Sequence, residues 1–264
     1  MAYNSLFDKV ENFWEKIDFR ALYYSGNLEQ VLEEVESDLK KEKSEINSET
    51  NRQLILQPAR IISRIINYKI GNVGKSDVGN ILKDSIKLGL DIYSGKSNAV
   101  YNINKLREKI TSFSDLNLLE GEFEQEMDLV TWKATNPIKS EDTAKGLVEK
   151  IENKPVLFVA LAHGGIAAGM DTYLRYCDKV DSNDSVFYTA RFSSRKIGDI
   201  WPQVTSGEID YLKEKSHGRR LVIFDEDRYT GKTLAVARDF FNLNVPTKEN
   251  AVIVANLDER ENKF

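Results

Sequence analysis

The chain has 264 residues, a net charge of −5 at pH 7 and 41% hydrophobic residues. This length suits one large domain or two smaller ones, and the near balance of acidic and basic residues excludes a global attraction to nucleic acid or acidic membranes. The lone Cys177 excludes a disulfide framework, and His163 and His217 are too few for a zinc-ligand cluster. Without a membrane-spanning apolar run or a signal-peptide pattern, the sequence predicts a soluble cytoplasmic protein with no membrane partner.

Residues 1–139 are predicted to form an all-α region, because apolar residues recur at helical spacing and no strand-type alternation is convincing. The first stripe comprises Phe7, Val10, Trp14 and Ile17. Asn27 is expected to cap a second helix, with Gln30 completing a capping box. Pro58 suits the first turn of a third helix. Further helices are expected over 77–93, 97–112 and 123–134.

Residues 140–264 have the alternation of a parallel-sheet α/β domain. Ser140 is expected to cap a helix that runs through Lys150. Apolar runs then predict four strands, over 156–161, 186–190, 220–224 and 251–255. Helices are predicted over 166–176, 209–215 and 234–241. Strand–helix alternation with short turns implies a parallel sheet with right-handed crossovers.

The strand over 220–224 is followed at once by Asp225, Glu226 and Asp227, and then by a small-residue loop that enters a helix. Ligands of open α/β sheets bind outside the carboxyl ends of the strands, and a helix N-terminus suits a phosphate. The ending Gly231-Lys232-Thr233 is similar to a P-loop. That motif requires a glycine five residues earlier, where Glu226 stands, so we reject a nucleoside-triphosphatase.

The segment resembles the ribose-phosphate signature of type I phosphoribosyltransferases, in which two acidic residues end a strand and a Thr-Gly-x-Thr loop enters a helix. The resemblance implies that Asp225 and Glu226 are the catalytic pair, which accepts hydrogen bonds from the ribose hydroxyls. It also implies that a second set of residues binds the 5′-phosphate: Asp227, Arg228, Tyr229, Thr230, Gly231, Lys232 and Thr233. The alternative is an ordinary solvated turn.

Two further segments match the family in the expected order. His163-Gly164-Gly165 follows the first strand, where the family has a loop that contacts pyrophosphate through backbone amides; glycines there permit positive φ and close approach to an anion. Arg195 and Lys196 lie in a long polar stretch over 191–218, where the family has a mobile loop that closes over the pyrophosphate. A tight structural turn, a bystander His163 ring and a solvated surface loop are the alternatives.

The sequence is closest in loop pattern to the purine-salvage branch, hypoxanthine phosphoribosyltransferases included. Where that branch has an aspartate near the purine, this chain has Tyr229, whose phenol is a poor base at neutral pH, so ordinary 6-oxopurine salvage is not favoured. Residues 1–139 are then expected to form a hood over the acceptor or to bind a partner.

The resemblance implies a glycosyltransferase that binds 5-phosphoribosyl-1-pyrophosphate with Mg²⁺ and transfers the phosphoribosyl group to an unidentified acceptor. No residue is assigned as a direct metal ligand. Two alternatives stay open. One is a non-catalytic module that senses a phosphoribosyl ligand and binds a protein or nucleic-acid partner through its helical half; the other is an interaction scaffold. Assembly into a homo-oligomer is compatible with each reading.

Overall fold

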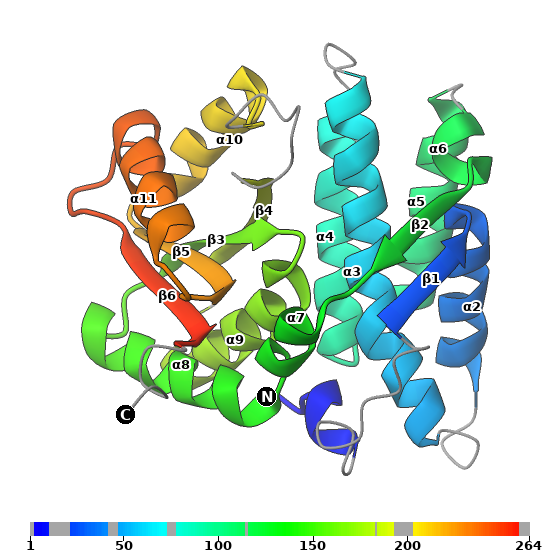
Figure 1. Cartoon of the computed structure of the whole chain (residues 1–264), viewed down its shortest axis with the longest axis horizontal. Coiled ribbons are helices and arrows are strands. Elements are labelled where there is room, and N and C mark those ends of the chain that lie inside the picture. Colours follow the sequence, from blue (N-terminus) through cyan, green and yellow to red (C-terminus); the bar gives the residue numbers. More distant parts are fainter. Residues whose placement is uncertain are drawn as a thin grey trace. The chain divides into compact units, whose positions relative to one another are not determined.

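The computed structural model describes residues 3–10, 22–41, 47–72, 78–113, 116–182, 184–192 and 203–258. The chain divides into two compact units (Figure 1). Asn4–Asp128 form what we term the helical unit, and Leu129–Phe264 with Met1–Tyr3 form the sheet unit. The division lies before Leu129, whereas the sequence suggested residue 140, because the short helix over 129–134 packs against the strands of the sheet unit.

In the helical unit, helices that follow one another in the sequence pack against each other around a core of buried leucines, isoleucines and valines. Its helices are η1 Leu6–Lys9, α2 Leu28–Lys40, α3 Ser48–Gly71, α4 Val78–Tyr93, α5 Ala99–Ser112 and α6 Leu116–Glu120. The predicted capping box is confirmed at the start of α2. Asn27 Oδ1 accepts a hydrogen bond from Gln30 N (2.9 Å), and Asn27 N donates to Gln30 Oε1 (3.0 Å). No helix in the described ranges is long and apolar enough to cross a bilayer.

The prediction that the N-terminal region is all-α is wrong. Strands β1 Tyr23–Gly26 and β2 Phe123–Glu126 form an antiparallel pair in which Tyr23 lies opposite Glu126. The helix predicted over 123–134 is therefore a strand followed by a separate helix. Each strand has only four residues, and its partner lies far away in the sequence, so neither shows a readable alternation by itself.

Two helix starts differ from the prediction because an asparagine upstream supplies the cap. Helix α3 begins at Ser48, where Asn47 Oδ1 accepts from Thr50 N (2.9 Å), and Pro58 lies inside the helix. Helix α8, Pro137–Ile151, is likewise capped by Asn136. Ser140 is buried within α8 instead of capping it, and its hydroxyl accepts a hydrogen bond from Asn256 Nδ2 (3.1 Å).

The sheet unit confirms the α/β prediction. Its four parallel strands have the order β4-β3-β5-β6. The strands are β3 Val156–Ala162, β4 Val186–Arg191, β5 Arg220–Asp227 and β6 Val252–Leu257. Helices α8 and α9 (Gly165–Val180) lie on one side of the sheet, and α10 (Ser206–Ser216) and α11 (Lys232–Asn244) lie on the other (Figure 1). The central strand β3 is buried along its whole length, as expected of a strand covered on both faces.

Helix α7, Leu129–Ala134, packs against β5 and β6 and belongs to the same unit. The buried side chain of Asn256 on β6 forms hydrogen bonds with residues of three helices. Its Nδ2 donates to Ala134 O at the end of α7 (2.7 Å) as well as to Ser140 in α8, and its Oδ1 accepts from Thr172 Oγ1 in α9 (3.2 Å). This network fixes the helices on one face of the sheet relative to its edge strand.

Candidate functional site

The two central strands bring separate predicted segments to one edge of the sheet. Strands β3 and β5 are parallel neighbours, with Ala160 opposite Phe224. Because parallel strands end on the same side, the 163–165 turn after β3 and the acidic end of β5 lie at the same carboxyl edge. The two segments are therefore adjacent in space although about sixty residues separate them in the sequence.

Gly164 lies directly against the carboxylate of Glu226. A methyl group built at Gly164 would stand 2.3 Å from Glu226 Cδ and 2.3 Å from Oε1, which is closer than side-chain carbons approach other atoms. The backbone of Gly164 has φ −59° and ψ −40°, so glycine is required for this close approach and not for the positive φ that the sequence suggested. At Gly165 an added methyl would make only ordinary contacts, 3.6 Å from Asp225 Cα.

The acidic end of β5 concentrates negative charge. Asp225 Oδ1 accepts a hydrogen bond from Glu226 N (3.1 Å). Burial raises the pKa of the Asp225 carboxyl well above its usual range; a hydrogen bond with the Glu226 side chain and repulsion from Glu226 and Asp227 raise that pKa further. Asp225 thus holds a proton more readily than an ordinary aspartate, and a protonated carboxyl donates a hydrogen bond while it still accepts another.

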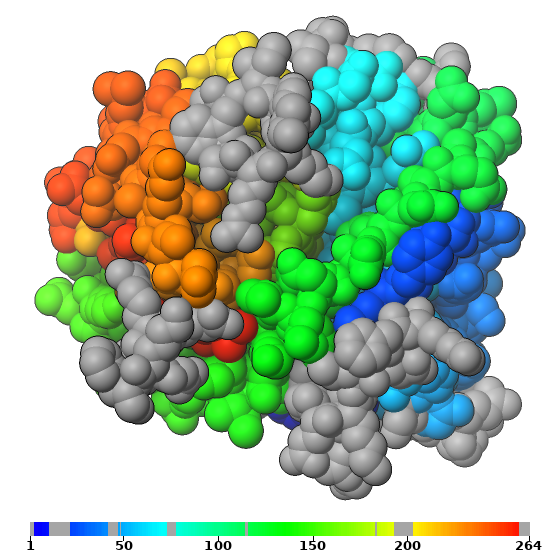
Figure 2. Space-filling view, in the orientation of Figure 1, coloured from blue at the N-terminus to red at the C-terminus, as the bar shows by residue number. Residues whose placement is uncertain are grey.

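The loop that follows turns into α11 through a left-handed glycine. Gly231 adopts φ 67° and ψ 0°, the left-handed conformation that glycine favours, and α11 begins at the next residue. Thr230 Oγ1 accepts a hydrogen bond from Lys232 N (3.3 Å). The N-cap residue of α11 is Gly231, so the N-cap position provides no side-chain acceptor. Tyr229, Thr230 and Lys232 are exposed, and Figure 2 shows the orange atoms of this part of the chain at the surface.

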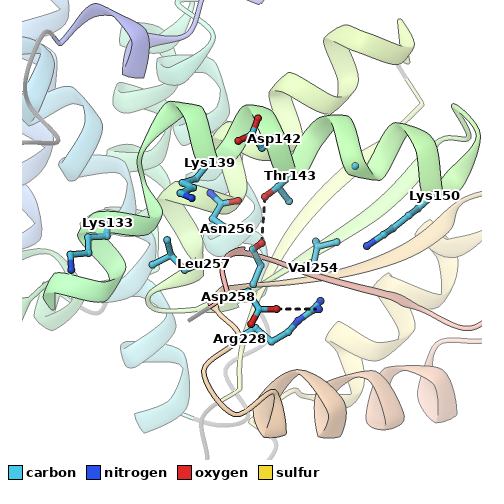
Figure 3. A pocket seen from close by; sticks show the side chains of 12 residues that line it. Lys133, Lys139, Asp142, Thr143, Lys150, Arg228, Val254, Asn256, Leu257 and Asp258 are labelled. Atoms are coloured by element: carbon cyan, nitrogen blue, oxygen red, sulfur yellow. Dashed lines mark hydrogen bonds and ion pairs between the residues drawn. The ribbon is translucent and has the colours of Figure 1, made fainter. Parts of the chain in front are cut away.

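The side chain of Arg228 is directed to β6. Its backbone N–H donates to Leu257 O (2.9 Å), its Nη2 donates to Ile253 O (3.0 Å), and its Nη1 lies 3.8 Å from Asp258 Oδ2 (Figure 3). The guanidinium and the backbone N–H of Arg228 are therefore both engaged with the edge strand. The contact of Arg228 with a 5′-phosphate stays a prediction.

His163 is half-buried, and its carbonyl accepts from Ile166 N (3.3 Å) in the first turn of α9. The peptide bond between Ala162 and His163 is cis. Arg195 and Lys196, predicted to contact pyrophosphate, lie outside the described residues. The segment that contains them is followed by α10, whose N-cap is Thr205; Glu208, the N3 residue of its capping box, accepts a hydrogen bond from Tyr188 OH on β4 (2.9 Å).

The sequence reading missed the cationic groove beside β6, which Arg228 helps to line. Lys139, Gly146 and Lys150 recur at helical spacing on one face of α8, and this pattern in the sequence could have revealed the groove. For metals, the described ranges contain no group of three or more His, Cys, Asp or Glu side chains arranged to hold an ion.

A comparison with protein-family models finds no match, and neither a curated protein nor a solved structure matches the chain. The resemblance to phosphoribosyltransferases thus depends on the motifs and on the geometry described above.

Proposed function

We propose that the sheet unit is a phosphoribosyltransferase-like enzyme that binds 5-phosphoribosyl-1-pyrophosphate and transfers its phosphoribosyl group to a nucleophile. The observation that carries the proposal is the contact between Gly164 and Glu226. The two residues belong to segments that the family resemblance assigns to pyrophosphate and to ribose. A donor molecule contains both groups on one sugar, so a site for it needs these two segments side by side.

In this proposal Asp225 and Glu226 bind the 2′ and 3′ hydroxyls of the ribose. Because burial raises the pKa of Asp225, its carboxyl can offer a donor as well as an acceptor, and the Glu226 side chain adds further acceptors, which suits two adjacent hydroxyls. The 5′-phosphate would lie at the start of α11, where Gly231 permits close backbone approach and Thr230 and Thr233 offer hydroxyls.

The reaction breaks the bond between the anomeric carbon and the pyrophosphate oxygen, and the electron pair leaves with pyrophosphate. A bond forms between the same carbon and the acceptor, which loses a proton to solvent or to a base. Positive charge develops on the sugar meanwhile, and the acidic side chains at the end of β5 would stabilise it from close by. Positioning and electrostatics would therefore supply most of the rate enhancement.

The acidic end of β5 fits a cation that the donor carries with it. Asp225, Glu226 and Asp227 place three carboxyl groups at this edge, and Mg²⁺ in proteins is commonly held by one or two carboxylates, waters and substrate phosphates. Bound with the donor, Mg²⁺ would neutralise charge on the departing pyrophosphate. The carboxylates would bind the ribose and lie near the ion, without forming a dedicated cage around it.

A second candidate is a sensing module that binds the donor without turnover. It is favoured by Tyr229, which stands where the purine-salvage branch has an aspartate near the base. The two candidates are separated by an assay for labelled pyrophosphate released from the donor, with pooled nucleobases, amines and nucleic acids as acceptors. Release that requires an acceptor supports the enzyme, whereas tight binding without release under any condition supports the sensor.

A further inference from the structure

A groove of about 490 Å³ lies between α8 and β6 in the sheet unit (Figure 3). This volume is within the range of sites that bind small molecules. The charged side chains that line it are Lys133, Lys139, Lys150 and Arg228 against Asp142 and Asp258. Although the whole chain has a net charge of −5, the groove therefore has an excess of positive charge.

Two of the three lysines of the groove, Lys139 and Lys150, are placed by the register of α8. Lys139, Gly146 and Lys150 follow one another at spacings of seven and four residues, so they share one face of the helix. Eleven residues separate the two lysines, a distance of about 16 Å along the helix axis at 1.5 Å per residue. Between them, a methyl group added to Gly146 would meet nothing within 4 Å, so the middle of the groove is open.

The two lysines that α8 contributes to the groove are not neutralised in the way that a solvated helix face usually is. Lys145, on another face of α8, lies 3.4 Å from Glu141, the usual i, i+4 pairing. In the described part of the chain, by contrast, neither Lys139 nor Lys150 forms an ion pair. Figure 3 shows the side chains of Lys150 and Arg228 extending toward one another. An anion between them would relieve the repulsion of these like charges.

We infer that this groove binds a phosphate-bearing small molecule with two or more negative charges. Its phosphates would lie between Lys150 and Arg228 and extend toward Lys139. Such a ligand would compete with Asp258, which is 3.8 Å from the Arg228 guanidinium. Arg228 also belongs to the loop that leads to Thr230, so the ligand would contact a residue of the candidate donor site from its opposite end. The inference does not rest on the proposed transferase activity.

The competing explanation is protection of a sheet edge. Strand β6 is the last strand of the sheet, and lysines near such an edge discourage pairing with other chains. Protection of the edge needs only positive charge there and no bound ligand. If it were the whole role of Lys139 and Lys150, these lysines would not be expected to bind an anion specifically.

The test is a calorimetric titration of the full chain with inorganic tripolyphosphate, repeated with adenosine diphosphate. The double variant Lys139→Ala/Lys150→Ala should weaken tripolyphosphate binding at least tenfold, while Lys139→Arg/Lys150→Arg should stay within about threefold of wild type. The control Lys145→Ala/Lys213→Ala removes the same charge from exposed, paired positions and should leave affinity unchanged. The titration with adenosine diphosphate identifies the class of ligand. Tighter binding of adenosine diphosphate than of tripolyphosphate indicates a nucleotide, and weaker binding indicates a phosphate chain alone.

Lys139→Ala/Lys150→Ala leaves the candidate donor site intact and should leave ribose 5-phosphate binding unchanged. This variant distinguishes failure of the groove from failure of the proposed transferase. Absence of tripolyphosphate binding by wild type, or an equal loss in the groove and control variants, would overturn the inference and leave edge protection as the role of the lysines.

Discussion

The Cα of Gly164 lies against the carboxylate of Glu226, so closely that a methyl group at residue 164 would stand 2.3 Å from Glu226 Cδ. This contact joins the turn after β3 to the acidic end of β5. It explains why a glycine is needed at a position with ordinary helical dihedral angles. It also means that the position of Glu226 can be altered without changing Glu226 itself.

Gly164→Ala should weaken donor binding at least tenfold while the protein stays folded. Alanine fits the backbone at φ −59°, and the atoms it would meet are the end of a flexible side chain, so Glu226 should move and the strands should not. The measurement is a donor titration with a thermal melt. Gly207→Ala is the control, because an added methyl there meets nothing within 4 Å. Unchanged donor affinity in Gly164→Ala would show that the placement of Glu226 is irrelevant to binding.

Thr230→Val and Thr233→Val should each weaken binding of ribose 5-phosphate by about 1–3 kcal/mol, because each removes a hydroxyl assigned to a charged phosphate. Thr230→Ser and Thr233→Ser keep the hydroxyl and should bind nearly as well as wild type. For Thr230 the serine variant also keeps the acceptor for Lys232 N, so loop geometry is controlled. Equal affinity of the valine variants and wild type would mean that the loop is only a turn.

Asp225→Asn should stabilise the protein increasingly as pH rises. The folded-state pKa of Asp225 is raised by burial and by Glu226, so the folded protein binds more protons than the unfolded chain. The free energy of unfolding of wild type therefore falls as pH rises from about 4, the unfolded value, through the raised pKa. Asparagine removes this loss. Urea unfolding between pH 4 and pH 8 measures it, and a stability difference that does not vary with pH would contradict the assignment.

Asn256→Ala should destabilise the sheet unit by about 2–3 kcal/mol, because it leaves Ala134 O and Thr172 Oγ1 without a buried hydrogen-bond partner. The free energy of unfolding from urea titration measures the effect. Asn80→Ala, an exposed position on α4, should change stability by less than about 0.5 kcal/mol. Similar values for the two variants would show that the Asn256 network does not hold the helices to β6.

The sheet unit could be predicted because its signals are local. Buried apolar runs predicted the four strands, and Gly231 followed by a helical stripe predicted the turn into α11. The pairing of β1 with β2 could not be predicted, since it joins two four-residue segments that are remote in sequence. The hydrogen bond from Arg228 Nη2 to Ile253 O could not be predicted either, because Ile253 lies on a later strand.

Calorimetric titration with 5-phosphoribosyl-1-pyrophosphate tests the proposed role of Asp225 and Glu226 most directly. Wild type should bind the donor in the presence of Mg²⁺ and more weakly without it. Asp225→Asn/Glu226→Gln keeps the shape of both side chains and removes their charge, so it should bind more weakly still, and released pyrophosphate should fall further than affinity because charge on the sugar develops mainly in the transition state. Failure of wild type to bind the donor with Mg²⁺, or equal binding by the double variant, would contradict the account.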